Sequence, residues 1–530
     1  MIKVNLPLLF LFLFVASKIS SQTLPVGTPI FEDYFRLEQL NGNVDSTLSF
    51  SVRPVYTRLS LQLTPNSADS ASNYLPKYLN AGVSGTQKKR YQFQILPLVL
   101  KQQLITNHPY QWNDGIMVPA KGYQTMLSGG VFLKAGPLRV QLRPELLFAQ
   151  NSDFTGFSAD PKSYPYSGNI DQPERFGNKA ISRAGLGQSS IRLTFNPVSL
   201  GISNENLWWG PGIRNSLLMS NTAPGFKHVT LNTTRPVRTP LGSLEAQMIG
   251  GKLEDSGLSN KRQDWRYLSG FVFSYHPKWI PGLFLGLSRT FQMYNKDMDG
   301  KIDDYIPFLQ SFSKVETNEG NKIRDQLTSV FARWLWREEK AEIYAEFGRN
   351  DHSYNLRDFA MTPDHSRAYL FGFSKSFNYR HKQDEYLHLN FELTQLQQSV
   401  NYINRDAGAW YIHGQVLHGY TQKGEVLGAG IGPGSNLQTF ALSWNKGLKK
   451  LGVQIERYEH NRDYFNAAYN NQNSGKEPWI DFSTEFTTNW LYKNILFESG
   501  LAVISSRNYY WEKSQNALNG RARVNVIYAF

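Results

Sequence analysis

The last ten residues of the chain, Arg521 to Phe530, read RARVNVIYAF. Successive side chains of a β-strand point to opposite faces, so every second residue of this stretch shares a face. The polar face carries Arg521, Arg523 and Asn525. The apolar face carries Ala522, Val524, Val526, Tyr528 and Phe530. Such a strand, ending on an aromatic residue, is typical of the closing strand of a bacterial outer-membrane barrel, so we expect an all-β, transmembrane antiparallel β-barrel.

Alternation with a period of two returns along the chain from about residue 128. Apolar residues alternate with polar or charged ones at 138–143, 191–195, 283–287, 341–347, 387–393, 440–444 and 451–456. The polar face carries charges of both signs, which suits a lumen filled with water or with side chains. At roughly 28 residues for each strand and its connection, the chain after residue 21 makes about 16 to 18 strands, an even number as in other bacterial barrels.

Loops are predicted where the alternation stops. The segments 151–188, 292–326 and 464–478 are rich in Gly, Pro, Asn and Asp, which favours long loops on one side of the barrel. The run GAGIGPG at 428–434 contains a proline and is followed by no helical pattern, so we expect a tight turn there.

The N-terminal hundred residues have a mixed pattern. Apolar residues at helical spacing predict a short amphipathic helix at 29–40 and a second helix at 69–79. Between them, Leu48, Phe50 and Val52 alternate with polar residues and predict a strand. A helix cannot form part of the wall of a membrane barrel, so we expect this small helical part to pack on the periplasmic side.

The first residues are typical of a secretory signal peptide. Lys3 precedes an apolar run from Leu6 to Ala16, and small and polar residues follow up to about Ser21. The apolar run is too short for a transmembrane helix, which needs roughly 20 residues. The chain has no cysteine, so we expect neither a lipoprotein nor disulfides. The expected organisation is a signal peptide over 1–21 and one barrel domain over 22–530, located in the bacterial outer membrane.

Composition and net charge indicate which kinds of molecule the protein can bind. Hydrophobic residues make up 41% of the chain and aromatic residues 14%, a balance that suits a barrel with aromatic girdles. A large secreted β protein, rich in aromatics that bind sugar, is the alternative. The net charge is +13, and removing Lys3 and Lys18 with the signal peptide leaves +11. A basic chain favours anionic partners such as lipopolysaccharide phosphates or an acidic polysaccharide. Nucleic acid is not expected, because the basic residues are dispersed.

Motifs for metal binding or catalysis are weak. The run NKDMDGKIDD at 295–304 places acidic residues as a calcium loop does, but Ile306 stands where the bidentate Glu belongs. We expect no tight metal site there, unless Asp303 or Asp304 substitutes. The chain contains no HExxH, no GxSxG and no phosphate-binding glycine loop. We therefore expect no cofactor, nominate no catalytic residue and predict that the protein is not an enzyme.

Four separated motifs carry a family resemblance. They are NENLWWGPGIRNSLLMSNTAPGFKHVTLNTTRPVRTPLG at 204–242, PDHSRAY at 363–369, FELTQLQQ at 391–398 and WYIHGQVLHGYTQKGEVLGAGIGPGSN at 410–436. With these motifs the chain resembles the capsule assembly family named for Wzi, in the form found in Bacteroidetes. The resemblance implies an outer-membrane barrel of about 18 strands with a small periplasmic helical part. It also implies a non-enzymatic lectin that binds capsular or exopolysaccharide and helps attach or assemble it at the cell surface.

Candidate polysaccharide-binding residues lie in two of these motifs. Aromatic rings stack on sugar faces, while Arg and Asn hydrogen-bond to hydroxyl and carboxylate groups. The candidates are Trp208, Trp209, Arg214, Asn221, Trp410, His413 and Tyr420. A structural role is the alternative for each, for example Trp208 and Trp209 in the interfacial aromatic belt.

The expected partners are capsular or extracellular polysaccharide, outer-membrane lipids, lipopolysaccharide and the barrel assembly machinery. Two other function classes remain open. A sugar-specific or general porin would conduct ions, and an outer-membrane enzyme would need a clustered catalytic set.

Overall fold

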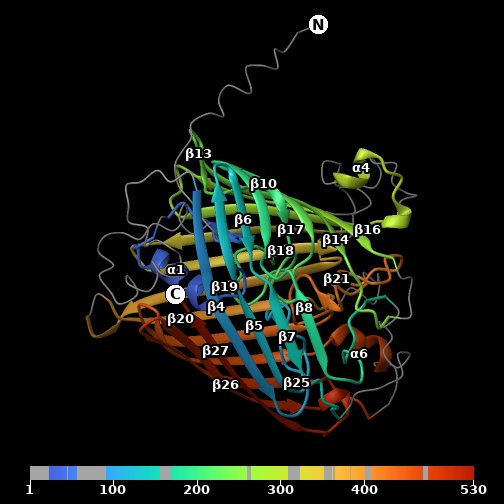
Figure 1. Cartoon of the computed structure of the whole chain (residues 1–530). Helices are drawn as coiled ribbons and strands as arrows, with labels where there is room; N and C mark the ends of the chain where they lie inside the picture. The colour runs from blue at the N-terminus through green and yellow to red at the C-terminus, as the bar shows by residue number, and fades with distance from the viewer. Residues whose placement is uncertain are drawn as a thin grey trace.

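The computed structural model describes residues 23–44, 46–56, 91–155, 169–259, 264–307, 323–350, 361, 364–381, 384–399, 408–469 and 475–530. Most of these residues form one closed barrel of antiparallel strands (Figure 1). The predicted signal peptide and the predicted helix at 69–79 lie outside the described residues.

The barrel wall consists of long strands, some of them split into two segments. In chain order the segments are β4 (Tyr91–Ile105), β5 (Gly122–Ala135), β6 (Leu138–Leu142), β7 (Glu145–Ala149), β8 (Ile181–Gly185), β9 (Ser190–Phe195), β10 (Val198–Ser203), β12 (His228–Thr233), β13 (Val237–Thr239), β14 (Gly242–Leu253), β15 (Arg266–Pro277), β16 (Leu283–Tyr294), β17 (Asp325–Trp336), β18 (Ala341–Asn350), β19 (Arg367–Asn378), β20 (Tyr386–Gln395), β23 (Asn436–Lys446), β24 (Lys449–Glu459), β25 (Ile480–Tyr492), β26 (Ile495–Arg507) and β27 (Ala517–Tyr528).

Pairing shows which segments share a strand. β6 and β7 both pair with β5, β12 and β13 both pair with β14, and β9 and β8 pair with β6 and β7. Each of these three couples therefore occupies one position in the wall. Within the described residues the closed barrel has 18 strands, at the upper end of the range expected from sequence.

The closing strand behaves as its sequence predicts. β27 pairs antiparallel with β4, from Arg521 opposite Ile105 to Tyr528 opposite Leu98, and so closes the barrel (Figure 1). Val524 and Tyr528 are exposed on the outer surface, whereas Arg521 is buried in the lumen. The two predicted faces are confirmed.

The same division into faces holds around the wall. Exposed apolar side chains, among them Leu193, Leu285 and Leu442, form the outer face. The polar residues between them, such as Arg192 and Glu342, are buried on the inner face. Side chains of this kind suit lipid outside and a polar interior inside. Among the described helices, none is both long and apolar enough to cross a membrane.

The two ends of the barrel differ in the length of their connections. Residues 447–448 join β23 to β24, and 493–494 join β25 to β26. The C-terminus lies at this short-turn end, because Tyr528 is paired with the residue that follows the second of these turns. Bacterial barrels place short turns in the periplasm and long loops outside the cell. The opposite, long-loop end is therefore extracellular.

The predicted loops lie at the extracellular end, with shorter bounds than expected. β8 lies within the predicted loop 151–188, and β9 begins just after it. β16 and β17 extend into the predicted loop 292–326. The helix α6 (Arg462–Tyr469) overlaps 464–478. These segments form regular structure because they pair in the wall ladders or, for α6, pack Tyr464 and Phe465 against Trp511.

The predicted N-terminal helix is confirmed as α1 (Pro29–Leu40). It lies at the periplasmic end but inside the lumen, near the C-terminus in Figure 1. Arg36 donates from Nε to Glu342 of β18 at 2.8 Å and from a second nitrogen to the carbonyl of Pro211 at 2.6 Å. Asp33 pairs with Lys450 at the start of β24. The helix enters the barrel because the charged inner wall offers partners to its polar side chains.

The strand predicted around Leu48 to Val52 is wrong for most of its length. Only Val52–Arg53 (β2) and Val55–Tyr56 (β3) are extended, and Phe50 has φ of 55°, which interrupts the run. β3 pairs with β1 (Thr23–Leu24), and β2 pairs with β11 (Trp208–Trp209) inside the barrel. The remaining short elements are β21 (Thr421–Gln422), β22 (Glu425–Val426), α4 (Ile302–Tyr305) and the single 3-10 turns at 295–297, 379–381 and 509–511.

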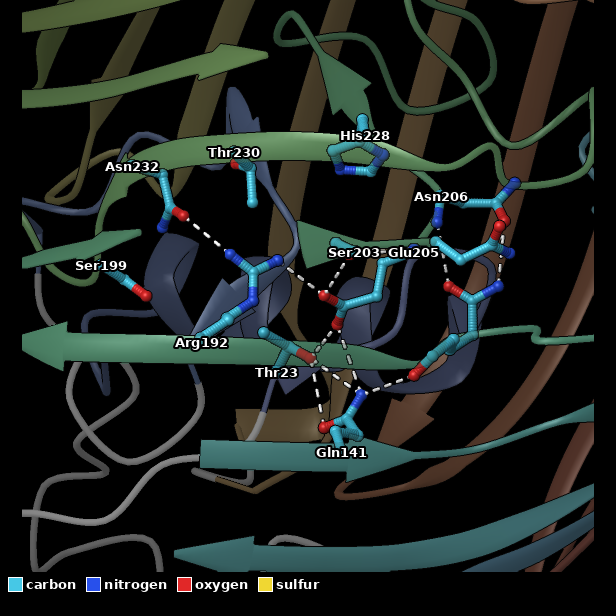
Figure 2. A network of polar contacts seen from close by, with 12 residues as sticks. Thr23, Gln141, Arg192, Ser199, Ser203, Glu205, Asn206, His228, Thr230 and Asn232 are labelled. Carbon is cyan, nitrogen blue, oxygen red and sulfur yellow. Dashed lines mark hydrogen bonds and ion pairs between the residues drawn. The ribbon is translucent and has the colours of Figure 1, made fainter. Parts of the chain in front are cut away.

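A polar network fixes the N-terminal segment to the inner wall (Figure 2). The carboxylate of Glu205 accepts a hydrogen bond from Thr23 and forms an ion pair with Arg192 of β9 at 2.7 Å. Gln141 of β6 donates to Thr23 at 3.1 Å, and Arg192 also donates to Asn232 of β12 at 2.9 Å. These groups are buried, so the network satisfies charges that would otherwise be costly inside the barrel.

Candidate functional site

Three of the predicted binding residues are core residues of the lumen. Trp209, Trp410 and Tyr420 are almost completely buried in one hydrophobic cluster. The indole of Trp209 donates to Gln247 at 2.9 Å, and that of Trp410 donates to the carbonyl of Ser366 at 2.9 Å. Tyr420 stacks against Tyr411. These contacts favour a structural role for all three residues.

Of the other four candidates, Trp208, Arg214 and Asn221 line one inner cavity, and His413 does not. Trp208 lies under the guanidinium of Arg53 at 4.4 Å. Asn221 donates to the carbonyl of Asn113 at 2.7 Å. His413 is half-buried and accepts from its own loop, at Val416 N. The structure does not bring the seven residues together on one surface. Placing Trp208 and Trp209 in the interfacial belt is also wrong, because both are buried inside the barrel.

Arg214 separates two cavities. Its Nε donates to Glu456 at 2.7 Å, and its guanidinium lies 4.9 Å from the ring centre of Trp112. On the periplasmic side it lines an inner cavity of about 200 Å³ next to α1. Trp112 lines an outer pocket of about 220 Å³. This stacked pair is one part of the layer between the two spaces.

The outer pocket opens among the extracellular loops and is rich in aromatic rings. Its lining comes from described residues of the loops at 106–121, 150–180, 396–435, 460–479 and 508–516, from Thr222 and from the adjoining end of β24. The aromatic lining residues are His108, Tyr110, Trp112, Phe154, Tyr458, His460, Trp479, Tyr509, Tyr510 and Trp511. They are far apart in sequence and meet because the strands that carry the loops are neighbours in the wall.

The rings of the outer pocket are held firmly. His460 stacks on Trp479 with centroids 3.6 Å apart and donates or accepts at Asp481, 2.7 Å from its Nε2. Trp479 in turn meets Trp511 edge to face at 5.5 Å. Tyr510 and Trp511 have φ of 58° and 61°, a strained backbone for aromatic residues that the surrounding contacts must hold. Trp479, Tyr510 and His460 remain half-buried, so they offer surface to a ligand.

Several polar groups of the pocket lining have unused hydrogen-bonding capacity. Within the described part of the chain, these buried atoms have no hydrogen-bond partner: His108 Nδ1, Gln111 Nε2, Trp112 Nε1, Glu425 Oε2 and Trp511 Nε1. Buried polar atoms are normally paired, so these atoms can accept hydrogen bonds from, or donate them to, water or a ligand, as can similar atoms around the inner cavity. Burial lowers the pKa of the His108 imidazole to about 4, so this ring is neutral at pH 7.

Sequence reasoning missed this pocket. Neither Trp479 nor the run Tyr509–Trp511 was selected, because each is a short aromatic stretch with no motif around it. The one available signal was three consecutive aromatic residues in a loop between two strong strand patterns.

At 295–304, the predicted weak calcium loop is part of an extracellular connection. Asp304 is buried, accepts from the backbone N–H of Asp299 at 2.7 Å and pairs with Arg324 at 3.4 Å. Among the residues that the structure describes, no group of three or more His, Cys, Asp or Glu side chains is placed to hold a metal.

We compared the chain with known protein families and solved structures. The family model of the capsule assembly protein Wzi matches residues 116–503. The structure is similar to that of Wzi from Escherichia coli, described as an outer-membrane, carbohydrate-binding β-barrel involved in group 1 capsule assembly. The TM-score is 0.65 at 14% identity, covering 96% of this chain and 99% of that chain. A search of curated proteins found no match.

Other solved barrels are less similar. OccAB1 of Acinetobacter baumannii has a TM-score of 0.42 at 7% identity, covering 83% of this chain and 96% of its own. OprD of Pseudomonas aeruginosa has a TM-score of 0.38 at 8% identity, covering 83% and 93%.

The closed barrel wall, its apolar outer face and the family match all indicate an outer-membrane β-barrel. The family model spans well over half of the chain and extends from the first extracellular loop into β26. The protein is a bacterial outer-membrane β-barrel, and it belongs to the capsule assembly protein Wzi family.

Proposed function

We propose that this barrel binds a surface polysaccharide in the outer pocket and helps to hold it at the cell surface. The observation that carries the proposal is an aromatic pocket at the extracellular end whose lining contains buried polar atoms without partners. Aromatic faces pack against the C–H faces of sugars, while unpaired polar atoms can exchange hydrogen bonds with hydroxyl groups. The carbohydrate-binding description of the Escherichia coli relative supports the same interpretation.

Binding in this proposal involves no catalysis. The His460 and Asp481 pair is the feature of the pocket that most resembles enzyme chemistry. The imidazole, however, lies 3.6 Å from the ring of Trp479 and 3.8 Å from that of Tyr458. Such packing suits a ring that is held in place as part of a stacking surface. The Asp481 carboxylate fixes its orientation.

The residues nominated from sequence contribute in a different way. We propose that Arg214 supports the pocket from behind, because its guanidinium stacks on the Trp112 ring. Asn221 holds the adjoining loop through the Asn113 carbonyl. His413 remains a candidate contact because it is half-buried. For Trp208, Trp209, Trp410 and Tyr420, burial supports an indirect role in which they keep the inner loops in place.

Replacing an accessible ring of the pocket tests the proposal. Trp479→Ala and Tyr510→Ala should each weaken binding of the purified barrel to the polysaccharide isolated from its own cells, by roughly threefold to tenfold. Tyr510→Ala should disturb the structure less than Trp479→Ala. The Tyr510 ring is half-buried, and its hydroxyl donates one hydrogen bond, to Glu174 at 2.8 Å. Titration calorimetry in detergent provides the affinity, and heat-modifiable gel mobility verifies folding.

Tyr305→Ala is the matched control. Tyr305 is an exposed aromatic residue of α4 on another extracellular connection, and it does not line the pocket. Its loss should leave the affinity unchanged. In cells, deleting the protein should move polysaccharide from the cell surface into the medium. If all three variants bind the polysaccharide as tightly as the wild type, and the deletion strain keeps its cell-bound polysaccharide, the proposed function is refuted and a porin is favoured.

A further inference from the structure

The ionisable groups of the outer pocket are an unusual set for a basic protein. No Lys or Arg is among the described residues that line it. The ionisable lining groups other than tyrosines are His108, Glu174, Glu425 and His460. His108 is neutral at pH 7, and any charge on His460 is balanced by Asp481, 2.7 Å away. The described lining of the pocket therefore offers no unbalanced positive charge.

The two carboxyl groups strengthen this conclusion. Glu174 is half-buried and accepts a hydrogen bond from the Tyr510 hydroxyl at 2.8 Å. Glu425 is buried, and burial raises the pKa of its carboxyl well above the ordinary value, against the opposing effect of the Arg183 guanidinium. A protonated carboxyl is a hydrogen-bond donor as well as an acceptor. Burial therefore disfavours a negative charge at Glu425, the deeper of the two carboxyl groups.

Four described cations near the pocket are paired with carboxylates, whereas Arg183, whose charge acts on Glu425, lies over the Phe176 ring. Arg214 pairs with Glu456 at 2.7 Å, and Arg521, whose guanidinium lies over the Tyr110 ring, pairs with Glu485 at 3.0 Å. Around the rim, Arg462 pairs with Glu459 and Lys476 with Glu512. Recruiting Arg214 or Arg521 to a ligand would leave a buried carboxylate, Glu456 or Glu485, without its partner, which is unfavourable.

Lysines lie at both ends of the barrel. Lysines occupy the short turns or the strand ends beside them at the periplasmic end: Lys134, Lys278, Lys340, Lys449 and Lys493. This is the opposite end of the barrel from the pocket. Attraction between exposed charges is screened over roughly 8 Å at physiological ionic strength. These periplasmic lysines are therefore too far from the pocket to attract an anion into it.

We propose that the sugar residue seated in the outer pocket is uncharged, a neutral hexose or an N-acylated hexosamine, and not a uronic acid. This inference rests on the proposed function of the pocket. A uronate carboxylate would leave water, meet no Lys or Arg in the described lining and lie near Glu174, so its desolvation would be poorly compensated. Hydroxyl and acylamido groups carry no charge and can pair with the neutral donors and acceptors of the lining.

Chemical neutralisation of the polymer provides the test. Polysaccharide isolated from the surface of the same cells is divided, and the uronic acids of one half are reduced to neutral sugars. Binding of both halves is measured for the wild-type barrel and for Tyr510→Ala, with sugar analysis of each sample. For each sample, the affinity of the wild type is divided by the affinity of Tyr510→Ala. This ratio isolates binding by the pocket, because charge attraction elsewhere on the protein is common to both proteins.

The inference predicts that this ratio changes less than twofold on carboxyl reduction, and that it is the same at low and at high salt. A polymer found to be neutral as isolated, with a ratio above threefold, also supports it. A ratio that falls to one on reduction would overturn the inference while leaving the proposed function intact. A ratio of one with both samples would instead overturn the proposed function. Trp479→Ala repeats the comparison if Tyr510→Ala fails the gel-mobility test for folding.

Discussion

His108 shows how one buried residue couples the pocket to pH. Its Nε2 lies 3.3 Å from the Ser506 hydroxyl, and its ring packs 4.6 Å from that of Tyr509. Burial favours the neutral ring and lowers its pKa to about 4, against an ordinary value of 6.5. The folded protein therefore binds this proton more weakly than the unfolded chain does. The stability due to His108 is full above pH 6.5 and is lost as the pH falls towards 4.

His108→Gln should remove this pH dependence. Between pH 6.5 and 4 the free energy of unfolding of the wild type should fall by up to about 3 kcal/mol more than that of the variant. Urea unfolding in detergent, followed by tryptophan fluorescence across that pH range, measures the difference. Because other titrating groups are common to both proteins, parallel pH curves would contradict the account of His108.

Single residues also show where sequence reasoning stopped. Three aromatic residues nominated for sugar binding, Trp209, Trp410 and Tyr420, form the lumen core, because a sequence pattern does not distinguish a buried aromatic from an accessible one. The residues that do line the pocket, such as Trp479 and Tyr510, come from loops separated by more than one strand. Only strand order in the closed wall brings them together.

The helix α1 is held in the lumen chiefly by buried charge. Glu342 of β18 lies between Arg36 of the helix and Arg333 of β17, with all three side chains nearly inaccessible to solvent. Arg36 also stacks over the Tyr344 ring at 4.8 Å. By contrast, the pair between Asp33 and Lys450 is partly exposed. A buried charged hydrogen bond contributes more than an exposed ion pair, so the two contacts should differ in strength.

Arg36→Met should lower the free energy of unfolding by about 1.5–3 kcal/mol, because Glu342 and the Pro211 carbonyl each lose a charged donor. Asp33→Asn is the matched control on the same helix, with an expected change of about 1 kcal/mol or less. Chemical unfolding of each variant in detergent compares them. If the control costs as much as Arg36→Met, buried charge is not what anchors the helix.

A strand or helix could be predicted from sequence where the local periodicity of apolar residues determines its structure. The faces of β27 and β18 follow from period two, and α1 follows from helical spacing, down to the residues at its ends. The strand expected at Leu48 to Val52 failed because Phe50 adopts φ of 55° inside the barrel, where tertiary contacts override the local pattern. The position of α1 within the lumen also depends on partners from distant strands.

As a whole, the molecule is a barrel with different surfaces at its two ends. Short turns connect the strands at the periplasmic end, whereas an aromatic pocket without Lys or Arg in its described lining opens among the loops at the extracellular end. Between them, the inner loops and α1 occupy the lumen, with the stacked pair of Arg214 and Trp112 between two cavities. This arrangement suits a protein that holds a polymer outside the cell.

The most direct test is a crystal structure of the barrel with oligosaccharide fragments of the surface polysaccharide from its own cells. The account predicts an uncharged sugar ring in the outer pocket, packed against Trp479 and Tyr510. Fragments bound instead in the inner cavity beside Arg36, or a charged sugar seated in the outer pocket, would contradict it.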